Sequence, residues 1–191
     1  MPQHLLPRLK DPRVFTKPLS KPLGYLRTLF LAPHCHLCRT VLHHDEVNHQ
    51  ICDACWQDQT PILNCCQCCA HPLELDGICS DCLILPKPYK KTVAAFLYQS
   101  PTDFLIKQFK QHQQLAIGKK LSHFLGKQVE KAYKYDTLPE HLIPTPLHWR
   151  KQLKRGFNQT ELMAQELSRS HNIHCSTILN KQEATPEQQS L

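Results

Sequence analysis

The clearest hydrophobic pattern lies in the second half of the chain, where apolar side chains recur at near-helical spacing between 117 and 132. Lysines fall mainly off this stripe, so the pattern predicts an amphipathic helix with a basic outer face. The stripe consists of Ile117, Leu121, Phe124, Leu125, Gln128 and Ala132.

Two further helices are predicted from their start signals. At 100–110, Ser100 can cap the helix and Pro101 suits its first position. At 157–170, Asn158 can cap and Glu161 stands at the third helical position. These segments alternate with runs typical of strands at 92–98, 141–147 and 173–179. The alternation favours an α/β fold with a mostly parallel sheet.

The beginning of the chain has a different pattern. Five of the 15 prolines and five basic residues fall in 1–22, which predicts an extended basic tail. The apolar run at 23–33 is too short to span a bilayer and predicts a short amphipathic helix. The layout of an export signal is absent, so we expect a cytoplasmic protein, in which paired cysteines are metal ligands more often than disulfides.

Ten of the 11 cysteines lie between 35 and 82, in the motifs CHLC, CDAC, CCQCC and CSDC. A two-residue spacing lets two thiolates reach one tetrahedral zinc ion. Because so short a segment cannot bury a sufficient core, bound metal would supply the missing stability. Four pairs predict two closed, structural zinc sites. A disulfide scaffold and a redox CxxC are the disfavoured alternatives.

The spacing leaves two choices open. The doubled motif can use Cys65 with Cys68 or Cys66 with Cys69, and the four pairs can combine sequentially or in a crossed order. The sequential order, which is the simpler one, places Cys35, Cys38, Cys52 and Cys55 on one zinc ion. Histidine can also bind zinc, but the cysteines already fill two sites. We therefore interpret the neighbouring histidines as surface residues: His34, His36, His43, His44, His49 and His71.

Charge is distributed unevenly along the chain. The net charge is +5 for 1–33, −6 for 34–85 and +8 for 86–191. A polyanion such as single-stranded DNA is therefore expected to bind outside the cysteine segment.

A basic stretch in the last segment predicts a more local anion site. Residues 148–156 read as a loop that leads into the helix at 157–170, whose N-terminal N–H groups favour an anion. Gly156 would let the backbone approach the anion or adopt a positive φ. The cations of this loop are Arg150, Lys151, Lys154 and Arg155.

Three stretches resemble the ComF family, bacterial proteins linked to competence and to the use of external DNA. They are CQCCAHPL, the segment LYQSPTDFLIKQFK with its following helix, and LIPTPLHWRKQLKRGFNQTELMAQELS. The resemblance favours Cys66 and Cys69 over the other frame, which gives the second site Cys66, Cys69, Cys79 and Cys82. It implies a double zinc ribbon, preceded by the amphipathic helix, over 23–85. It also implies a type I phosphoribosyltransferase-like α/β domain over 86–191.

The resemblance further implies a function in DNA uptake or in the use of imported DNA. Single-stranded DNA, a phosphoribosyl pyrophosphate-like anion and competence or DNA-processing proteins are the expected partners. The pyrophosphate site would be formed by Arg150, Lys154, Arg155, Gly156 and Asn158.

One departure from the family pattern bears on catalysis. The adjacent acids that bind the sugar in that fold have no counterpart after Ser170, because the one acidic pair, Asp45-Glu46, lies in the cysteine segment. We therefore expect a truncated or reduced relative without phosphoribosyl transfer. The alternative function is a zinc-ribbon adaptor that binds nucleic acid or protein.

Overall fold

The computed structural model describes residues 32–43 and 50–183. The chain divides into two compact units, Met1–Pro33 and His34–Leu191, and the description below concerns the second. The predicted basic tail at 1–22 and nearly all of the predicted apolar helix at 23–33 lie outside the described residues.

The second unit begins with irregular, cysteine-rich chain and continues as a helical region with one small sheet. In order, its elements are α2 (Asp53–Gln57), α3 (Ser80–Ile84), α4 (Thr102–His112), α5 (Leu115–Ala132), β1 (His141–Leu142), α6 (Trp149–Arg155), α7 (Gln159–His171) and β2 (His174–Cys175).

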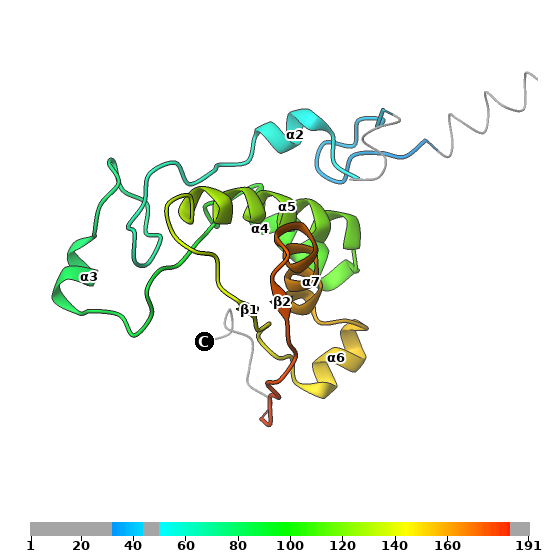
Figure 1. The fold of residues 1–191 in the computed structure, drawn as a ribbon. Coiled ribbons are helices and arrows are strands. Elements are labelled where there is room, and N and C mark those ends of the chain that lie inside the picture. Colours follow the sequence, from blue (N-terminus) through cyan, green and yellow to red (C-terminus); the bar gives the residue numbers. More distant parts are fainter. Residues whose placement is uncertain (1–31, 44–49, 184–191) are drawn as a thin grey trace, which may run out of the picture. The chain divides into compact units, whose positions relative to one another are not determined.

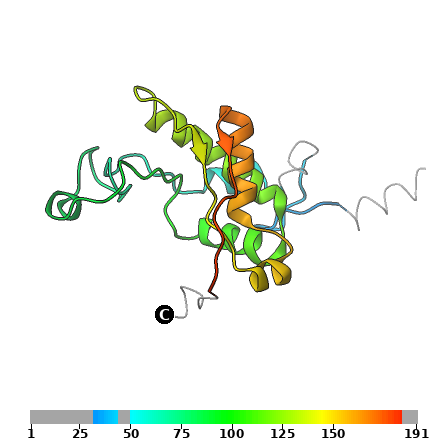
Figure 2. The same ribbon diagram turned by 60° about the horizontal axis from the view of Figure 1, so that its bottom comes forward.

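The two strands form a parallel pair (Figure 1), in which His141 lies opposite His174 and Leu142 opposite Cys175. The chain between them passes through α6 and α7, so that the four elements make a β–α–α–β crossover. Helix α7 packs along α5, as the second view shows (Figure 2). The predicted parallel pairing is therefore present, although within the described residues the sheet has two strands.

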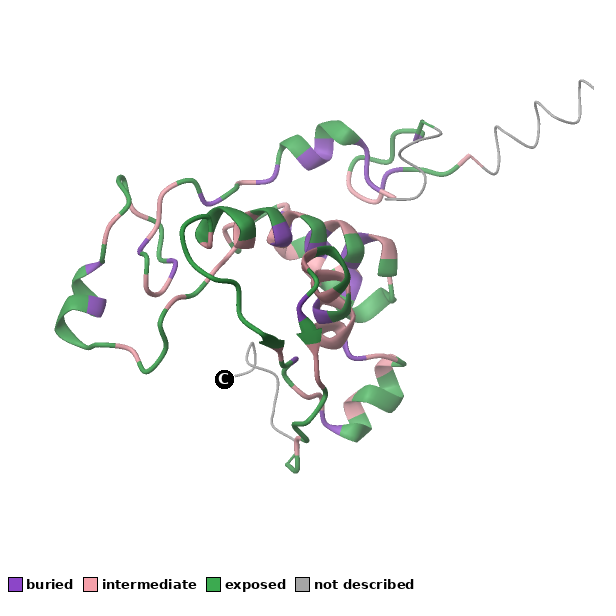
Figure 3. Cartoon of the chain, viewed as in Figure 1, coloured by how far each residue is buried: buried purple, intermediate pink, exposed green. Residues whose placement is uncertain are grey.

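The core lies where α4 and α5 meet the first cysteine motifs. Leu105, Phe109 and Ile117 are at most 2% exposed and belong to one cluster with Cys35 and Trp56. The Trp56 ring stacks on Phe124 of α5 with ring centroids 5.5 Å apart. Burial therefore concentrates on α2, α4 and α5, whereas α6 buries no residue (Figure 3).

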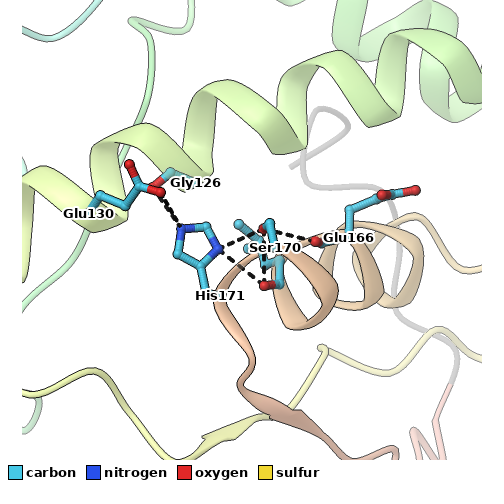
Figure 4. Close-up of polar contacts among 6 residues, drawn as sticks. Gly126, Glu130, Glu166, Ser170 and His171 are labelled. Atoms are coloured by element: carbon cyan, nitrogen blue, oxygen red, sulfur yellow. Dashed lines mark hydrogen bonds and ion pairs between the residues drawn. The ribbon is translucent and has the colours of Figure 1, made fainter.

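A close contact joins α5 to α7 (Figure 4). The His171 side chain is 5% exposed, and its Nε2 lies 3.2 Å from the Gly126 carbonyl oxygen and 3.4 Å from Glu130 Oε1. A Cβ at Gly126 would lie 2.7 Å from His171 Cε1, so the absence of a side chain there permits the approach.

The strand predictions were mostly wrong in extent. Residues 92–98 form no strand, and Phe96 makes only an isolated antiparallel bridge with Pro61, which lacks the N–H that a longer ladder needs. The strand predicted at 141–147 is reduced to its first two residues, and Ile143 is 46% exposed rather than buried. Pro144 and Pro146 interrupt the hydrogen-bonding ability of this stretch. Of 173–179, only His174–Cys175 is a strand.

The helix predictions were confirmed with small shifts. Helix α4 begins at Thr102, and Pro101 rather than Ser100 takes the capping position. Helix α5 extends the predicted stripe by two residues at its start. Helix α7 begins after Asn158, whose side chain accepts a hydrogen bond from the Thr160 N–H, as a capping residue should.

The basic stretch before α7 was predicted as a loop and is instead the short helix α6. Its start is capped by His148, whose Nδ1 accepts a hydrogen bond from the Arg150 N–H at 3.3 Å. Gly156 ends it with φ at 81°, the left-handed conformation that glycine adopts without strain. The positive φ predicted as one option for Gly156 is confirmed.

Among the described residues, none of the helices has both the length and the apolar character that a membrane crossing requires.

We predict that Gly118→Ala destabilises the protein. A Cβ at this position would collide with the ring of Phe109, which is 2% exposed and cannot turn away. Overpacking of about 1–3 kcal/mol should exceed the gain of up to about 1 kcal/mol from replacing glycine in a helix. Urea unfolding of the zinc-loaded protein measures the difference.

Gly77→Ala is the matched control, because a Cβ at Gly77 meets no atom within 4 Å. Unchanged stability in Gly118→Ala together with an unchanged control would show that the packing of α4 on α5 is looser than described.

Candidate metal centres and basic cluster

The structure brings eight cysteines together in two groups. In each group the sulfur atoms all lie within 4.8 Å of one another, which is close enough for one ion to contact all four. The groups are Cys35, Cys38, Cys52 and Cys55, and Cys66, Cys69, Cys79 and Cys82. The pairs therefore combine in the sequential order, not the crossed one.

The first half of each group has the same backbone geometry. The Cys35 N–H donates to the Thr40 carbonyl at 2.8 Å, and the Arg39 N–H donates to the Cys35 carbonyl at 3.0 Å. In the second group, Cys66 N–H to His71 carbonyl (2.8 Å) and Ala70 N–H to Cys66 carbonyl (2.9 Å) repeat these bonds. Arg39 and Ala70 both have a positive φ, 64° and 61°. The two knuckles are therefore structural copies.

The second half of each group begins a short helix. Cys52 and Cys79 are the N-cap residues of α2 and α3. The first turn of each helix places the sulfur of Cys55 or Cys82 near the other three sulfurs of its group. The Cys52 N–H points at Cys35 Sγ (3.4 Å), and the Cys79 N–H points at Cys66 Sγ at the same distance. Each pair of halves is thus joined by an N–H···S bond of the kind that stabilises a metal-bound thiolate.

The metal-free thiols differ in acidity within each group. Hydrogen bonding to Thr40 lowers the pKa of Cys38 to about 6, and the backbone N–H of Cys79 helps to lower that of Cys66 to about 6. Burial raises the pKa of Cys55 and Cys82 far above the usual range of a thiol. Four thiolates therefore need a neighbouring positive charge to coexist, and a divalent ion supplies it.

The residues fit zinc as a structural ion. Four sulfur donors and no oxygen donor are the set that zinc takes in closed sites, where no position remains for a substrate. Within each group three of the four cysteines are buried. The fourth is Cys38, which is exposed, in the first group and Cys69, which is half-buried, in the second. The arrangement can stabilise the fold, but it offers no open coordination position for catalysis.

The doubled motif uses Cys66 and Cys69. Cys65 lies outside the group, and its N–H donates to Asp76 Oδ1 at 3.0 Å. Cys68 is also outside the group, although it packs against it, and its carbonyl accepts a hydrogen bond from the Thr92 N–H at 2.7 Å. Cys66 and Cys69 therefore belong to the group of four sulfurs, whereas the backbone of Cys65 and Cys68 is hydrogen-bonded to Asp76 and Thr92.

None of the neighbouring histidines whose positions are described joins a group. His34, His43 and His71 are exposed and His36 is half-buried. His44 and His49 lie outside the described residues.

The residues predicted to bind an anion are spread over α6 and the start of α7. Arg155 Nη1 donates to Gln159 Oε1 at 2.6 Å, and the Arg150 guanidinium lies over the Trp149 ring at 5.2 Å. Lys154 is exposed one turn after Arg150. Asn158 is 9% exposed, and its Nδ2 donates to the Thr145 carbonyl at 3.2 Å. Arg155, Gly156 and Asn158 are adjacent in the α6–α7 corner, whereas Arg150 and Lys154 extend along α6.

Trp56 is the residue that the sequence analysis missed. It follows Cys55 directly, and its ring packs on Phe124 of α5, outside the ribbon segment. A large aromatic side chain in a segment too short for a core was the available signal, because it has to be buried against another part of the chain. A hydrogen bond also joins the ribbon segment to the helices, since Thr102 Oγ1 of α4 donates to the buried Gln59 Oε1 at 2.8 Å.

Comparison with known proteins agrees with this geometry. Residues 26–83 match the family model described as a double zinc ribbon domain, which contains both groups of cysteines. No solved structure matches the chain.

The curated relatives match most of this chain, and the matched region covers about 70% of their own length. DNA utilization protein YhgH of Escherichia coli O157:H7 is 32% identical over 164 residues, which cover 82% of this chain and 70% of that protein. Competence protein F of Haemophilus influenzae is 32% identical over 161 residues, or 82% of this chain and 69% of its own length. The YhgH protein of Salmonella typhimurium is 29% identical over 164 residues, with the same coverage of 82% and 70%. Two cysteine-held zinc ribbons and this extent of similarity place the chain in the ComF family, together with competence protein F and the DNA utilization protein YhgH.

Proposed function

We propose that the chain acts in DNA uptake or in the use of imported DNA, as a zinc-ribbon protein that binds DNA through its basic, helical part. The observation that carries the proposal is the similarity to relatives named for DNA utilization and competence, which extends past the ribbons over 82% of the chain. The charge distribution supports it, since the ribbon segment is acidic and 86–191 is basic. A polyanion would gain counterion release only in the basic part.

The finer proposal is a phosphoribosyltransferase-like α/β domain with a pyrophosphate-type anion site at the α6–α7 corner. In a parallel crossover, ligands bind beyond the carboxyl ends of the strands, and the chain leaving β1 leads to this corner through α6. Gly156 carries no side chain, and Arg155 beside it supplies a guanidinium that can bind two phosphate oxygens. The N–H groups at the start of α7 would complete the anion site.

The second candidate is an adaptor that binds another protein through the second ribbon. Its support is the exposure of apolar side chains on and near α3, where Leu83 is 66% and Ile84 is 82% exposed. An adaptor needs no anion site, so pyrophosphate binding separates the two functions.

We assign the two groups of four cysteines as the ligands of two zinc ions. Metal analysis of reduced, unchelated protein should give about two equivalents of zinc. Cys66→Ser should lower this to about one, because the second group would lose its most buried thiolate.

Cys65→Ser is the matched control, one position away in the same motif, and should keep both ions. The opposite result, in which Cys65→Ser loses a zinc ion and Cys66→Ser does not, would contradict the assigned frame.

Arg155→Ala should abolish weak pyrophosphate binding, and Arg155→Lys should restore only part of it, because an ammonium lacks the planar fork of the guanidinium. Isothermal titration at low ionic strength measures both. Lys110→Ala on α4 is the control for general loss of positive charge, since Lys110 is exposed and outside the corner. Equal weakening in Arg155→Ala and Lys110→Ala would mean that binding is nonspecific.

A further inference from the structure

A cavity of about 440 Å³ lies between α5 and α2, the helix that also carries Cys55 of the first group, and none of its lining residues belongs to the α6–α7 corner. One wall comes from α2 and the residues after it, and the other from α5 and Phe96. Its volume falls within the range of about 300–1,000 Å³ typical of small-molecule sites. The proposed functions above give this cavity no role.

Aromatic rings form much of the lining. Trp56 stacks on Phe124 at 5.5 Å and an angle of 26°, and Phe96 meets Phe124 edge to face at 5.4 Å. All three line the cavity. A planar ring can pack against such a surface, and stacking of this kind is tolerant of which base is bound.

The polar groups of the cavity suit a ring that carries phosphate. The Lys120 ammonium lies 5.6 Å from the Trp56 ring centroid, which places a positive charge beside the aromatic surface. Gln57 and Gln128 offer amide donors and acceptors to the edge of a ring.

Trp56 also carries an unsatisfied polar atom beside the cavity. It is 6% exposed, and its Nε1 has no hydrogen-bond partner among the residues that the structure describes. A buried indole N–H usually finds an acceptor, and leaving it without one is costly. Because the Nε1 atom is itself buried, an acceptor on a bound base would reach it only after the lining side chains shift.

We propose that this cavity binds a nucleobase with its attached phosphate, the base against Trp56, Phe96 and Phe124 and the phosphate at Lys120. The ligand is either a free nucleotide or one unit of a single DNA strand, and in the second case the inference rests on the proposed DNA function. The first ribbon then has a binding role in addition to its structural one.

Tryptophan fluorescence tests this directly, because the chain has two tryptophans and Trp149 is 57% exposed on α6. In a zinc-loaded Trp149→Phe variant the emission comes from Trp56 alone. We expect saturable quenching by a thymidine oligonucleotide or by deoxynucleoside monophosphates, and none by pyrophosphate or by an oligonucleotide made only of abasic sites. Quenching by mononucleotides as tight as by the strand identifies a free nucleotide as ligand, and much tighter quenching by the strand identifies DNA.

Lys120→Ala in the same background should weaken the quenching about tenfold, as expected for a lost charge-assisted contact. Lys119→Ala is the matched control, since Lys119 is the preceding residue on α5 but lines a different cavity. Zinc content and melting temperature establish that both variants are folded.

The outcomes separate this inference from the proposed function. No quenching, or equal effects of the two lysine substitutions, would overturn the nucleobase cavity. If strand binding, followed by anisotropy of a labelled oligonucleotide, persists in that case, only the cavity is wrong. Absence of any strand binding would overturn the proposed DNA function as well.

Discussion

The structure of the ribbon segment depends on one constraint, which is that four cysteine sulfurs approach within 4.8 Å of one another at each of two places. Thiolates repel at such distances, and protonated thiols make only weak hydrogen bonds, so a divalent ion is what makes the arrangement favourable. The short helices α2 and α3, the two left-handed residues and the N–H···S bonds all follow from placing four sulfurs around one centre.

The two ribbons depend on this constraint to different degrees. Three cysteines of the first ribbon, Cys35, Cys52 and Cys55, share a core with residues of α4 and α5, so metal binding and hydrophobic burial stabilise this ribbon together. Among the described residues, the buried cluster of the second ribbon consists of Cys66, Cys79 and Cys82, with Leu73 as the one partly buried residue other than cysteine packed against it. The stability of this ribbon must therefore come almost entirely from the metal. Zinc in the first ribbon also fixes α2, which carries Trp56. The shape of the cavity beside α5 is therefore coupled to the first metal site.

Much of this could be predicted from the sequence, and the failures have physical causes. The helices could be predicted because capping residues such as Asn158 and the apolar stripe of α5 depend on residues close together in the sequence. The sequence spacing left both cysteine frames open, since Cys65–Cys68 and Cys66–Cys69 are identical in spacing, and the folded chain brings only the second pair together with Cys79 and Cys82. The strand predicted at 92–98 does not form, because a strand needs a neighbour with which it can exchange hydrogen bonds. The residue opposite Phe96 is Pro61, which has no N–H to donate. Likewise, nothing near Trp56 in sequence indicates that it packs on Phe124, 68 residues later.

X-ray absorption at the zinc edge of the reduced, zinc-loaded protein tests the central claim most directly. Two closed sites made only of cysteine predict a first shell of four sulfur atoms per zinc at about 2.3 Å. A shell that requires nitrogen at about 2.0–2.1 Å would contradict the account, because a histidine would then replace one of the eight assigned cysteines.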